Sequence, residues 1–302
     1  MPGDFLPTAT LDMLRRRAEL MRQVRQFFDS RGFLEVETPI LSHDVVVDRH
    51  LDPLRVTLFR DPRQPHLGDT LWLQTSPEFA MKRLLAAGAK AIYQVNKVFR
   101  GGEAGQLHNP EFTMVEWYRV GDDYEAGMKL LSDLADALLG HGSADPYTFN
   151  QAMRLFGGTE PLGMSPFDLD LVLTTKVQPK LGLDRPAIVY DYPAEQAALA
   201  RIRPGDPPVA ERFELFASGI ELANGYHELL DPAILRERSR ANNAARAADG
   251  KFTLPEESRL LAAMDHGLPP CSGCALGFDR LVMVATGAKS IQEVMAFPID
   301  RA

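Results

Sequence analysis

The chain has 302 residues, of which 45% are hydrophobic and 25% are charged, and both fractions are ordinary for a soluble globular protein. Its formal net charge of −8 argues against a protein that binds nucleic acid through a broad positive surface. Glycine, proline or charged residues interrupt every apolar stretch well before the roughly 18 residues that a membrane helix needs. We therefore expect a cytoplasmic protein with no membrane segment.

The two cysteines occur together as Cys271-Ser-Gly-Cys274. Two cysteines cannot form a disulfide framework, and a single CxxC lacks the second ligand pair of a structural zinc site. His266 lies nearby, so zinc binding or redox chemistry is the alternative. We favour two buried thiols.

In chain order, the first predicted element is a helix of about 20 residues, because the apolar residues from Leu11 to Phe28 recur with the spacing of one helical face. Gly32 stands where a left-handed cap would end it. Residues 33–38 alternate in character and stop at Pro39, which is typical of a strand.

The sequence Ser76-Pro77-Glu78 indicates a helix start, with serine as the N-cap and proline at the first helical position. Residues 91–99 and 111–118 are predicted to be the strands of an antiparallel hairpin, joined by the polar loop 100–110.

The second half of the chain continues the mixture of helices and strands. A helix is expected at 126–139, whereas 141–210 is rich in proline, glycine and aspartate and offers only short helical pieces. The later elements are strands around 212–230, helices from Asp231-Pro232 and near 256–266, a strand entering a helix at 273–286, and a capping box at Ser290-x-x-Glu293. No repeat or linker divides this pattern, which predicts one α+β domain over residues 1–302.

The predicted hairpin at 213–229, FELFASGIELANGYHEL, is unusually acidic. A turn centred on Ala217-Ser218 would place Glu214 directly opposite Glu221, and two facing carboxylates repel unless a cation lies between them. Oxygen ligands suit Mg²⁺ held against a nucleotide. A bulge at Asn224-Gly225 would bring Glu228 to the same face as Glu221. The alternative is that some of these acids are exposed on an edge strand.

In the predicted strand 111–118, Glu116 and Tyr118 share one face with Phe112 and Met114. An acid and a phenol among apolar neighbours can bind a buried ammonium group, although a structural salt bridge is the alternative for Glu116. At the end of the preceding strand, Arg100 can reach a phosphate, or it can be an ordinary surface arginine.

The chain has no phosphate-binding loop: residues 101–106 lack the GK[ST] ending, and no GxGxxG follows a strand. A bound nucleotide would therefore have to be held by arginines and metal. Arg280 is a second candidate at a strand-to-helix junction, and Gly277 could let a nucleotide lie against the backbone.

At this point the residues resemble a family. The segments FFDSRGFLEVETPIL, FRGGEAGQLHNPEFTMVEWY and GCALGFDRLVM resemble, in order and spacing, the three motifs of class II aminoacyl-tRNA synthetases. With TSPEFAMKRLL and ELANGYHEL they resemble the lysyl branch, over nearly the whole chain. The first motif starts at Phe27, which leaves too few residues for the OB-fold anticodon-binding domain of lysyl-tRNA synthetases. The chain is thus similar to the elongation factor P–(R)-β-lysine ligases, which have Ala, here Ala275, where lysyl-tRNA synthetases usually have Gly.

The resemblance implies a class II catalytic core with a mostly antiparallel sheet flanked by helices and no anticodon-binding domain. It further implies ATP and Mg²⁺, (R)-β-lysine or lysine as substrate, elongation factor P as acceptor, and a homodimer built on the first motif. A free-standing lysyl-tRNA synthetase core and a catalytically silent paralogue are the alternatives; the acidic balance makes a tRNA partner the weaker interpretation.

The resemblance also implies roles for individual residues. For the nucleotide they are Arg100 at the α-phosphate and Arg280 at the γ-phosphate, both catalytic, with His108, Asn109, Leu222 and Gly277 around the rest of it, and Glu214 and Glu221 on Mg²⁺. For the amino acid they are Glu78 at the nearer amine with Ser76 and Pro77 beside it, Asn224 at the carboxylate, Glu116, Tyr118 and Glu228 at the ε-ammonium, and Ala275 next to the pocket. Gly102 stands where the family usually has Glu, so either Glu103 replaces that acid or ATP binding is weaker.

Overall fold

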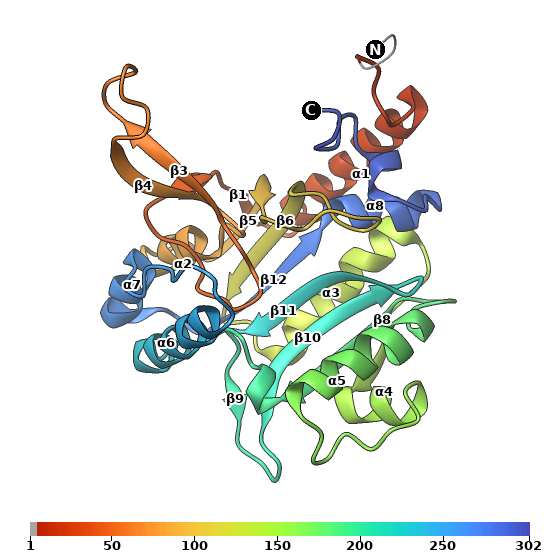
Figure 1. Ribbon diagram of the computed structural model, residues 1–302. Coiled ribbons are helices and arrows are strands. Elements are labelled where there is room, and N and C mark those ends of the chain that lie inside the picture. Colours follow the sequence, from red (N-terminus) through yellow and green to blue (C-terminus); the bar gives the residue numbers. More distant parts are fainter. Residues whose placement is uncertain (1–4) are drawn as a thin grey trace.

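The computed structural model describes residues 5–302, and its central element is a nine-stranded sheet (Figure 1). The strands in spatial order are β1 (Leu34–Glu35), β5 (Ala91–Phe99), β6 (Glu111–Val120), β12 (Cys271–Gly277), β11 (Ile220–His227), β10 (Val209–Ala217), β8 (Ala187–Pro193) and β7 (Asp145–Thr148), and β9 (Ile202–Arg203) pairs with β10. The pairings from β5 to β8 are antiparallel, and only the outer pairs β1–β5 and β7–β8 are parallel. The predicted α+β class with a mostly antiparallel sheet is confirmed.

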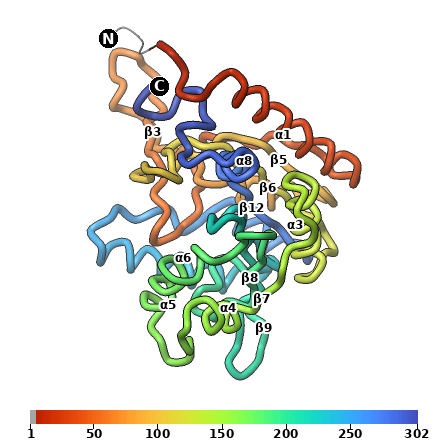
Figure 2. Tube along the Cα trace, turned by 90° about the vertical axis from the view of Figure 1, so that its right-hand side faces the viewer, coloured from red at the N-terminus to blue at the C-terminus, as the bar shows by residue number. Residues whose placement is uncertain are grey.

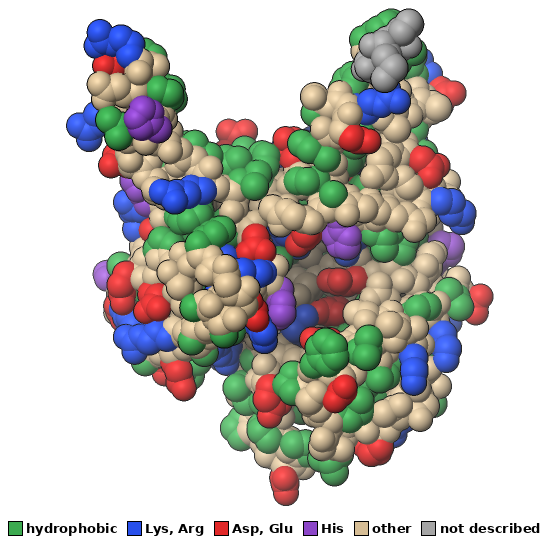
Figure 3. All heavy atoms as spheres, in the orientation of Figure 1, with side chains coloured by type: hydrophobic (Ala, Val, Ile, Leu, Met, Phe, Trp, Pro, Cys, Tyr) green, Lys and Arg blue, Asp and Glu red, His purple; other side chains and the backbone are tan. Residues whose placement is uncertain are grey.

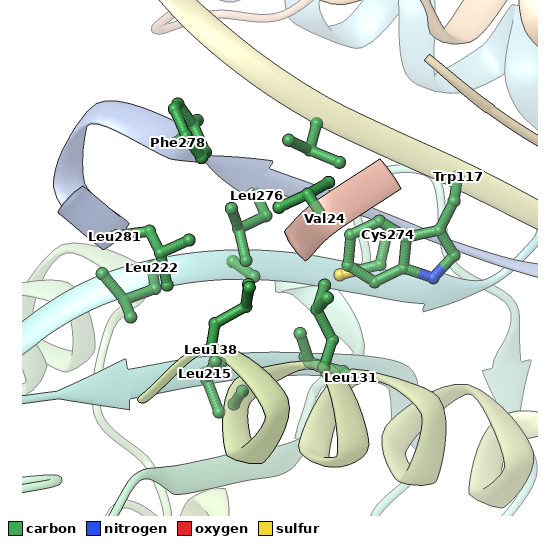
Figure 4. Close-up of a cluster of buried hydrophobic side chains, with 14 of the residues drawn as sticks. Val24, Trp117, Leu131, Leu138, Leu215, Leu222, Cys274, Leu276, Phe278 and Leu281 are labelled. Atoms are coloured by element: carbon green, nitrogen blue, oxygen red, sulfur yellow. The ribbon is translucent and has the colours of Figure 1, made fainter. Parts of the chain in front are cut away.

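Three helices cover one face of this sheet: α1 (Leu11–Asp29), α3 (Tyr124–Leu139) and α8 (Phe278–Thr286). In Figure 2, α1 runs along the upper edge and α3 lies below it on the same side. Figure 4 shows the core between them, where Val24 of α1 and Leu131 of α3 meet Leu276 of β12. Burying one such side chain contributes roughly 1.5–3 kcal/mol, so this layer fixes the sheet from behind.

The opposite face of the sheet is bordered by α2 (Glu78–Ala86), α6 (Pro232–Ala248) and α7 (Arg259–Gly267), which share a second core. Near the β7 edge lie α4 (Phe149–Leu155), α5 (Pro166–Val172) and the short helical turns η1 (Leu173–Val177), η2 (Gln178–Lys180) and η3 (Ala194–Gln196), and η4 (Ile291–Val294) follows α8. None of the helices within residues 5–302 is long and apolar enough to cross a membrane.

The first helix confirms its prediction and shows what ends it. The hydroxyl of Thr10 accepts a hydrogen bond from the Met13 backbone N–H at 3.1 Å and so caps the start of α1. Gly32, just beyond the end, has φ +74°, the left-handed conformation expected of it. The predicted strand at 33–38 is confirmed only in part: Leu34–Glu35 pair with β5, and the Val36 N–H still donates to the Tyr93 carbonyl at 2.9 Å. The Thr38 N–H instead donates to the Gln94 side chain, so the chain has already left the sheet.

Two regions have more structure than the sequence suggested. Residues 41–73 form a second sheet in the order β2 (Leu41–Ser42), β4 (Gly68–Leu73) and β3 (Leu54–Phe59), and its β3–β4 hairpin projects from the body (Figure 1). The proline-rich region 141–210, expected to hold only helical pieces, also supplies strands β7, β8 and β9. β7 has only four residues, and the seven residues of β8, AIVYDYP, begin with a continuous apolar run that periodicity alone cannot assign to a strand.

The hairpin of β10 and β11 has a different register from the predicted one. Its turn is formed by Ser218 and Gly219, with φ +53° and +73°, and Ala217 pairs with Ile220. A tight hairpin turn of this type needs positive φ at both central positions, which favours a pair containing glycine over Ala217-Ser218. Glu214 consequently lies opposite Asn224 and not opposite Glu221, so the predicted facing pair is wrong.

A bulge is present in this hairpin, but not at Asn224-Gly225 as predicted. The register shifts between Leu215 and Phe216, which pair with Ala223 and Glu221 and leave Leu222 as the extra residue. Glu221 and Glu228 nevertheless line the same cavity.

Candidate active site

A cavity of about 730 Å³ opens on the sheet face opposite the core, and acidic side chains are visible in its wall (Figure 3). Side chains alternate between the two faces of a strand, so β6 directs Phe112, Met114, Glu116 and Tyr118 into it, and residues of β11 and β12 line it beside them. The cavity brings together most of the residues singled out from the sequence: Ser76, Glu78, Arg100, Glu103, His108, Asn109, Glu116, Tyr118, Glu221, Leu222, Asn224, Glu228, Ala275, Gly277 and Arg280. Pro77 and Glu214 are not among its lining residues.

At one end lies a group that we call the acid pocket: Glu78 and Lys82 of α2, Glu116 and Tyr118 of β6, and Glu228 just after β11. Glu116 is 1% exposed. Its carboxylate accepts hydrogen bonds from the Tyr118 hydroxyl at 2.6 Å and from the Ser76 hydroxyl at 2.8 Å. Burial, helped by the charge of Glu78, raises the pKa of Glu116 to about 7. An ammonium group entering the pocket would restore the charged form.

Glu78 and Glu228 meet at the ammonium of Lys82, which sequence reasoning did not single out. Lys82 Nζ lies 2.5 Å from Glu78 Oε1 and 2.5 Å from Glu228 Oε2, and Lys82 is 2% exposed. Burial raises the pKa of Glu228 to about 8, against the opposing effect of Lys82. The sequence could have identified Lys82, because it follows Glu78 by four residues and so lies one turn along the same helical face.

The middle of the cavity is shaped by β12. Ala275 pairs with Glu116 on one side and with Asn224 on the other, so its methyl group lies between two predicted substrate contacts. The Oδ1 atom of Asn224 is buried and has no hydrogen-bond partner within residues 5–302, which leaves it available to a ligand. A Cβ on Gly273 would lie 2.2 Å from the Tyr118 ring and 2.5 Å from Glu228 Oε1, so glycine is required there to seat the acid pocket.

At the other end lies a group that we call the arginine end: Arg100, Glu103, His108, Glu221 and Arg280. The Arg280 guanidinium donates to His108 Nε2 at 2.6 Å and to the Glu221 carbonyl at 3.0 Å. Burial and the charge of Arg280 lower the pKa of His108, so the imidazole is neutral and can accept this bond. The Arg100 guanidinium lies 5.1 Å from the Phe112 ring centre, and its buried Nε has no partner in the described part of the chain.

The arginine end is held by a contact from the first helix. Asp279, the neighbour of Arg280, is 1% exposed. It pairs with Arg17 of α1 at 2.6 Å and accepts a bond from the Thr113 N–H of β6 at 2.6 Å. This network fixes the start of α8, and therefore Arg280, against β6.

Gly277, at the end of β12, leaves open space in the cavity, since the nearest atoms to an added Cβ would lie at 3.8 Å.

The conformation of the loop 100–110 explains why Gly102 stands where the family usually has glutamate. Gly102 has φ +78°, which disfavours the glutamate that the family usually has there. The next residue, Glu103, lines the cavity. Asn109 is buried, and its amide serves the backbone: Nδ2 donates to the Glu111 carbonyl at 2.6 Å and Oδ1 accepts from the Ile299 N–H at 3.0 Å. Asn109 therefore has little hydrogen-bonding capacity left for a nucleotide.

The two acids predicted to hold Mg²⁺ are placed differently. Glu214 is buried and accepts hydrogen bonds from Arg212 and from the Tyr192 hydroxyl. Glu221 lines the cavity, and its Oε2 lies 3.6 Å from Arg280 Nη1. Burial and the charge of Glu214 raise the pKa of Glu221, a repulsion that a cation would relieve. Glu221 thus fits a metal shared with phosphates, whereas Glu214 acts as a second charge behind it.

Other lining residues were missed by the sequence analysis. Arg212 and Tyr226 lie on the cavity face of the β10–β11 hairpin, two residues from Glu214 and from Asn224, so the alternation of the strands could have identified them. Another wall of the cavity is formed by segments that are far apart in the sequence, and no sequence pattern predicts their residues. It includes His50, Asp170, Gln196, Arg238 and Asn242.

The two cysteines are buried and free, which agrees with the favoured interpretation. Their spacing of three places them on opposite faces of β12, with Cys274 in the main core and Cys271 in the core beneath α2. Burial raises the pKa of the Cys271 thiol to about 12. No cluster of three or more metal-ligating side chains occurs within residues 5–302.

Comparison with known proteins agrees with this geometry. The family model for class II tRNA synthetases (D, K and N) matches residues 4–301. The chain is 46% identical to the elongation factor P–(R)-β-lysine ligase of Vibrio cholerae serotype O1, over 99% of both chains. It is 44% identical to the protein of the same name from Klebsiella pneumoniae strain 342, over 98% of both chains. The chain therefore belongs to the class II tRNA synthetase family of the D, K and N type.

Proposed function

We propose that this protein is an ATP-dependent ligase that activates (R)-β-lysine or lysine as an adenylate and transfers it to a lysine of elongation factor P. The observation that carries the proposal is the joining, in one cavity, of a buried acid pocket and an arginine end. The names and full-length similarity of the relatives support the same acceptor. Because elongation factor P is a translation factor, the reaction belongs in the cytoplasm.

In the activation step the residues of the chain act mainly by positioning. Glu78, Glu116 and Glu228 hold the two ammonium groups, and Asn224 holds the substrate carboxylate near the α-phosphate of ATP. That carboxylate attacks the α-phosphorus, and pyrophosphate leaves. Arg100 and Arg280 stabilise the charge on the phosphates. Both arginines line the cavity, which supports these roles.

Magnesium would add charge neutralisation at the phosphates when bound. We propose Glu221 as its ligand, with Glu214 contributing its charge from behind. Glu103 would take the adenine-side role of the missing family glutamate, with His108, Leu222 and Gly277 around the nucleotide. In the second step the acceptor amine attacks the carbonyl carbon of the adenylate and AMP leaves.

We further propose a homodimer that packs along the first motif. Leu34 of β1, within the first motif, is 62% exposed, and Leu11, at the start of the helix that leads into the motif, is 65% exposed; exposed apolar residues suit a partner chain. Sedimentation of the purified protein tests this: a mass of two chains is expected, and a mass of one chain would contradict it.

The ligase proposal is tested by incubating the protein with ATP, Mg²⁺, each lysine isomer and elongation factor P, followed by intact-mass measurement. We expect a mass increase on the factor equal to one lysyl group, and we expect a larger fraction of the factor to be modified with the β isomer. Charging of tRNA(Lys) with an unmodified factor would contradict the proposal.

A further inference from the structure

Lys82 joins two carboxylates of the acid pocket, Glu78 and Glu228, but is not itself among the residues that line the cavity. It lies on α2, one turn after Glu78, and its Nζ pairs with one oxygen each of Glu78 and Glu228. It also lies 5.8 Å from the Tyr118 ring centre. The Oε1 atom of Glu228 is buried and has no hydrogen-bond partner within the described residues. Lys82 thus engages part of each carboxylate and leaves an oxygen of Glu228 for another donor.

The charges of the acid pocket can be counted. Three buried carboxylates carry three negative charges when ionised, and Lys82 supplies one positive charge. Two negative charges remain, and buried charge without compensation is costly. A diamino acid such as lysine has two ammonium groups, which would neutralise them.

Among residues 5–302, no other titratable group packed against the pocket changes this count near neutral pH. Burial raises the pKa of Tyr118 and of Tyr226 on β11, and of Cys271 and Cys274 on β12, so all four stay neutral. Arg212, on β10, is paired with Glu214. Arg201 donates to the Glu228 backbone carbonyl at 2.8 Å and is not part of the cavity lining. The guanidiniums of the arginine end line the part of the cavity that we propose for the phosphates.

We propose that Lys82 is a positioning residue that sets the charge of the acid pocket to the value neutralised by a substrate with two ammonium groups. Its two ion pairs hold Glu78 and Glu228 in place and leave one pair of charges for the substrate. The inference rests on the proposed function, since it assumes that a diamino acid enters this pocket. It goes further by assigning substrate selection to a residue that does not touch the reacting atoms.

The test compares Lys82→Met, which keeps length without charge, with Lys82→Arg, which keeps the charge. Lys129→Met is the matched control, because Lys129 also pairs with an acid four residues away but is 74% exposed. ATP–pyrophosphate exchange is measured against lysine concentration from pH 6.5 to 8.5. In the wild type, the KM for lysine should fall as pH rises, because Glu116 and Glu228 lose their protons near pH 7 and 8.

Without the charge of Lys82, the carboxylates hold their protons more strongly. For Lys82→Met we expect a KM for lysine about tenfold higher at pH 7, a pH profile displaced upward by about one unit, and a kcat that changes less. Lys82→Arg and Lys129→Met should keep the wild-type profile. A wild-type profile in Lys82→Met, or equal damage in Lys82→Arg, overturns the inference.

If Lys82→Met does not fold, the inference is tested on the wild type by titration calorimetry in buffers of different ionisation enthalpy, which measures how many protons are released when a ligand binds. Lysine should displace protons from the pocket at pH 7, and norleucine, which lacks the second ammonium, should displace fewer. Equal proton release for both ligands overturns the inference. Failure of the proposed function looks different, since the wild type would then show no exchange with either lysine isomer.

Discussion

At the acid pocket, three carboxylates and one ammonium are almost completely removed from water, whereas at the arginine end Arg280 and Glu221 keep 21% and 36% of their side chains exposed. Charges in the first group are held by each other and by Ser76 and Tyr118. Charges in the second group face open space. The difference in burial supports the proposed division of the cavity, with the ammonium groups of the substrate in the buried pocket and the phosphates of ATP at the more exposed end.

The largest expected effect is at the arginine end. Arg100→Ala should lower the rate of adenylate formation by about a hundredfold to a thousandfold, because preorganised donors to developing charge are worth that much. The melting temperature should change little, since Arg100 contributes no ion pair among the described residues. Pyrophosphate exchange measures the rate, with the exposed Arg63→Ala as control. An unchanged rate would contradict the proposed role of Arg100 in adenylate formation.

The next effect is at the acid pocket. Glu116→Gln keeps the shape of the side chain but removes the charge, and it should raise the KM for lysine by about tenfold to a hundredfold, the value of a charged hydrogen bond. The KM for ATP should stay near the wild-type value, which separates the two ends. Glu125→Gln, at the start of α3, is the control. Parallel losses for both ligands would show that the ends are not independent.

Two glycines on the same strand sharpen the comparison. An added methyl at Gly273 meets Tyr118 and Glu228, so Gly273→Ala should lower stability by about 1–3 kcal/mol and raise the KM for lysine. At Gly277 the same methyl meets nothing closer than 3.8 Å, so Gly277→Ala should keep the melting temperature and raise only the KM for ATP. Thermal unfolding and exchange kinetics together check both. Identical behaviour of the two variants would contradict the assignment.

The smallest expected effect is on stability against pH. The pKa values of Glu116 and Glu228 are raised from 4.5 to about 7 and about 8. The folded protein therefore binds these protons more tightly than the unfolded chain does. The resulting contribution to the free energy of unfolding is complete below pH 4.5 and is lost as the pH rises through the raised pKa. The ligand-free protein should therefore melt at a lower temperature at pH 8.5 than at pH 6, by a few degrees at most, and lysine should restore much of the loss. No response to lysine at pH 8.5 would count against the pocket.

Sequence reasoning found the site largely because the strands carry their chemistry with period two. Glu116 and Tyr118 alternate with core residues, and β6 places them as expected. The predicted β10–β11 register was wrong for two reasons: the turn is at Ser218-Gly219, one residue later than predicted, and the extra residue Leu222 shifts every later partner. The wall formed by His50, Asp170 and Asn242 could not be predicted, because a loop and the helices α5 and α6, far apart in the sequence, meet there only through tertiary packing.

A crystal structure with a diamino acid and a non-hydrolysable ATP analogue tests the central claim most directly. The account predicts two ammonium groups among the carboxylates of Glu78, Glu116 and Glu228, with the ligand carboxylate turned toward Asn224 and the α-phosphate beside Arg100. An amino acid bound with its ammonium groups outside those three carboxylates, or phosphates placed away from Arg100 and Arg280, would contradict it.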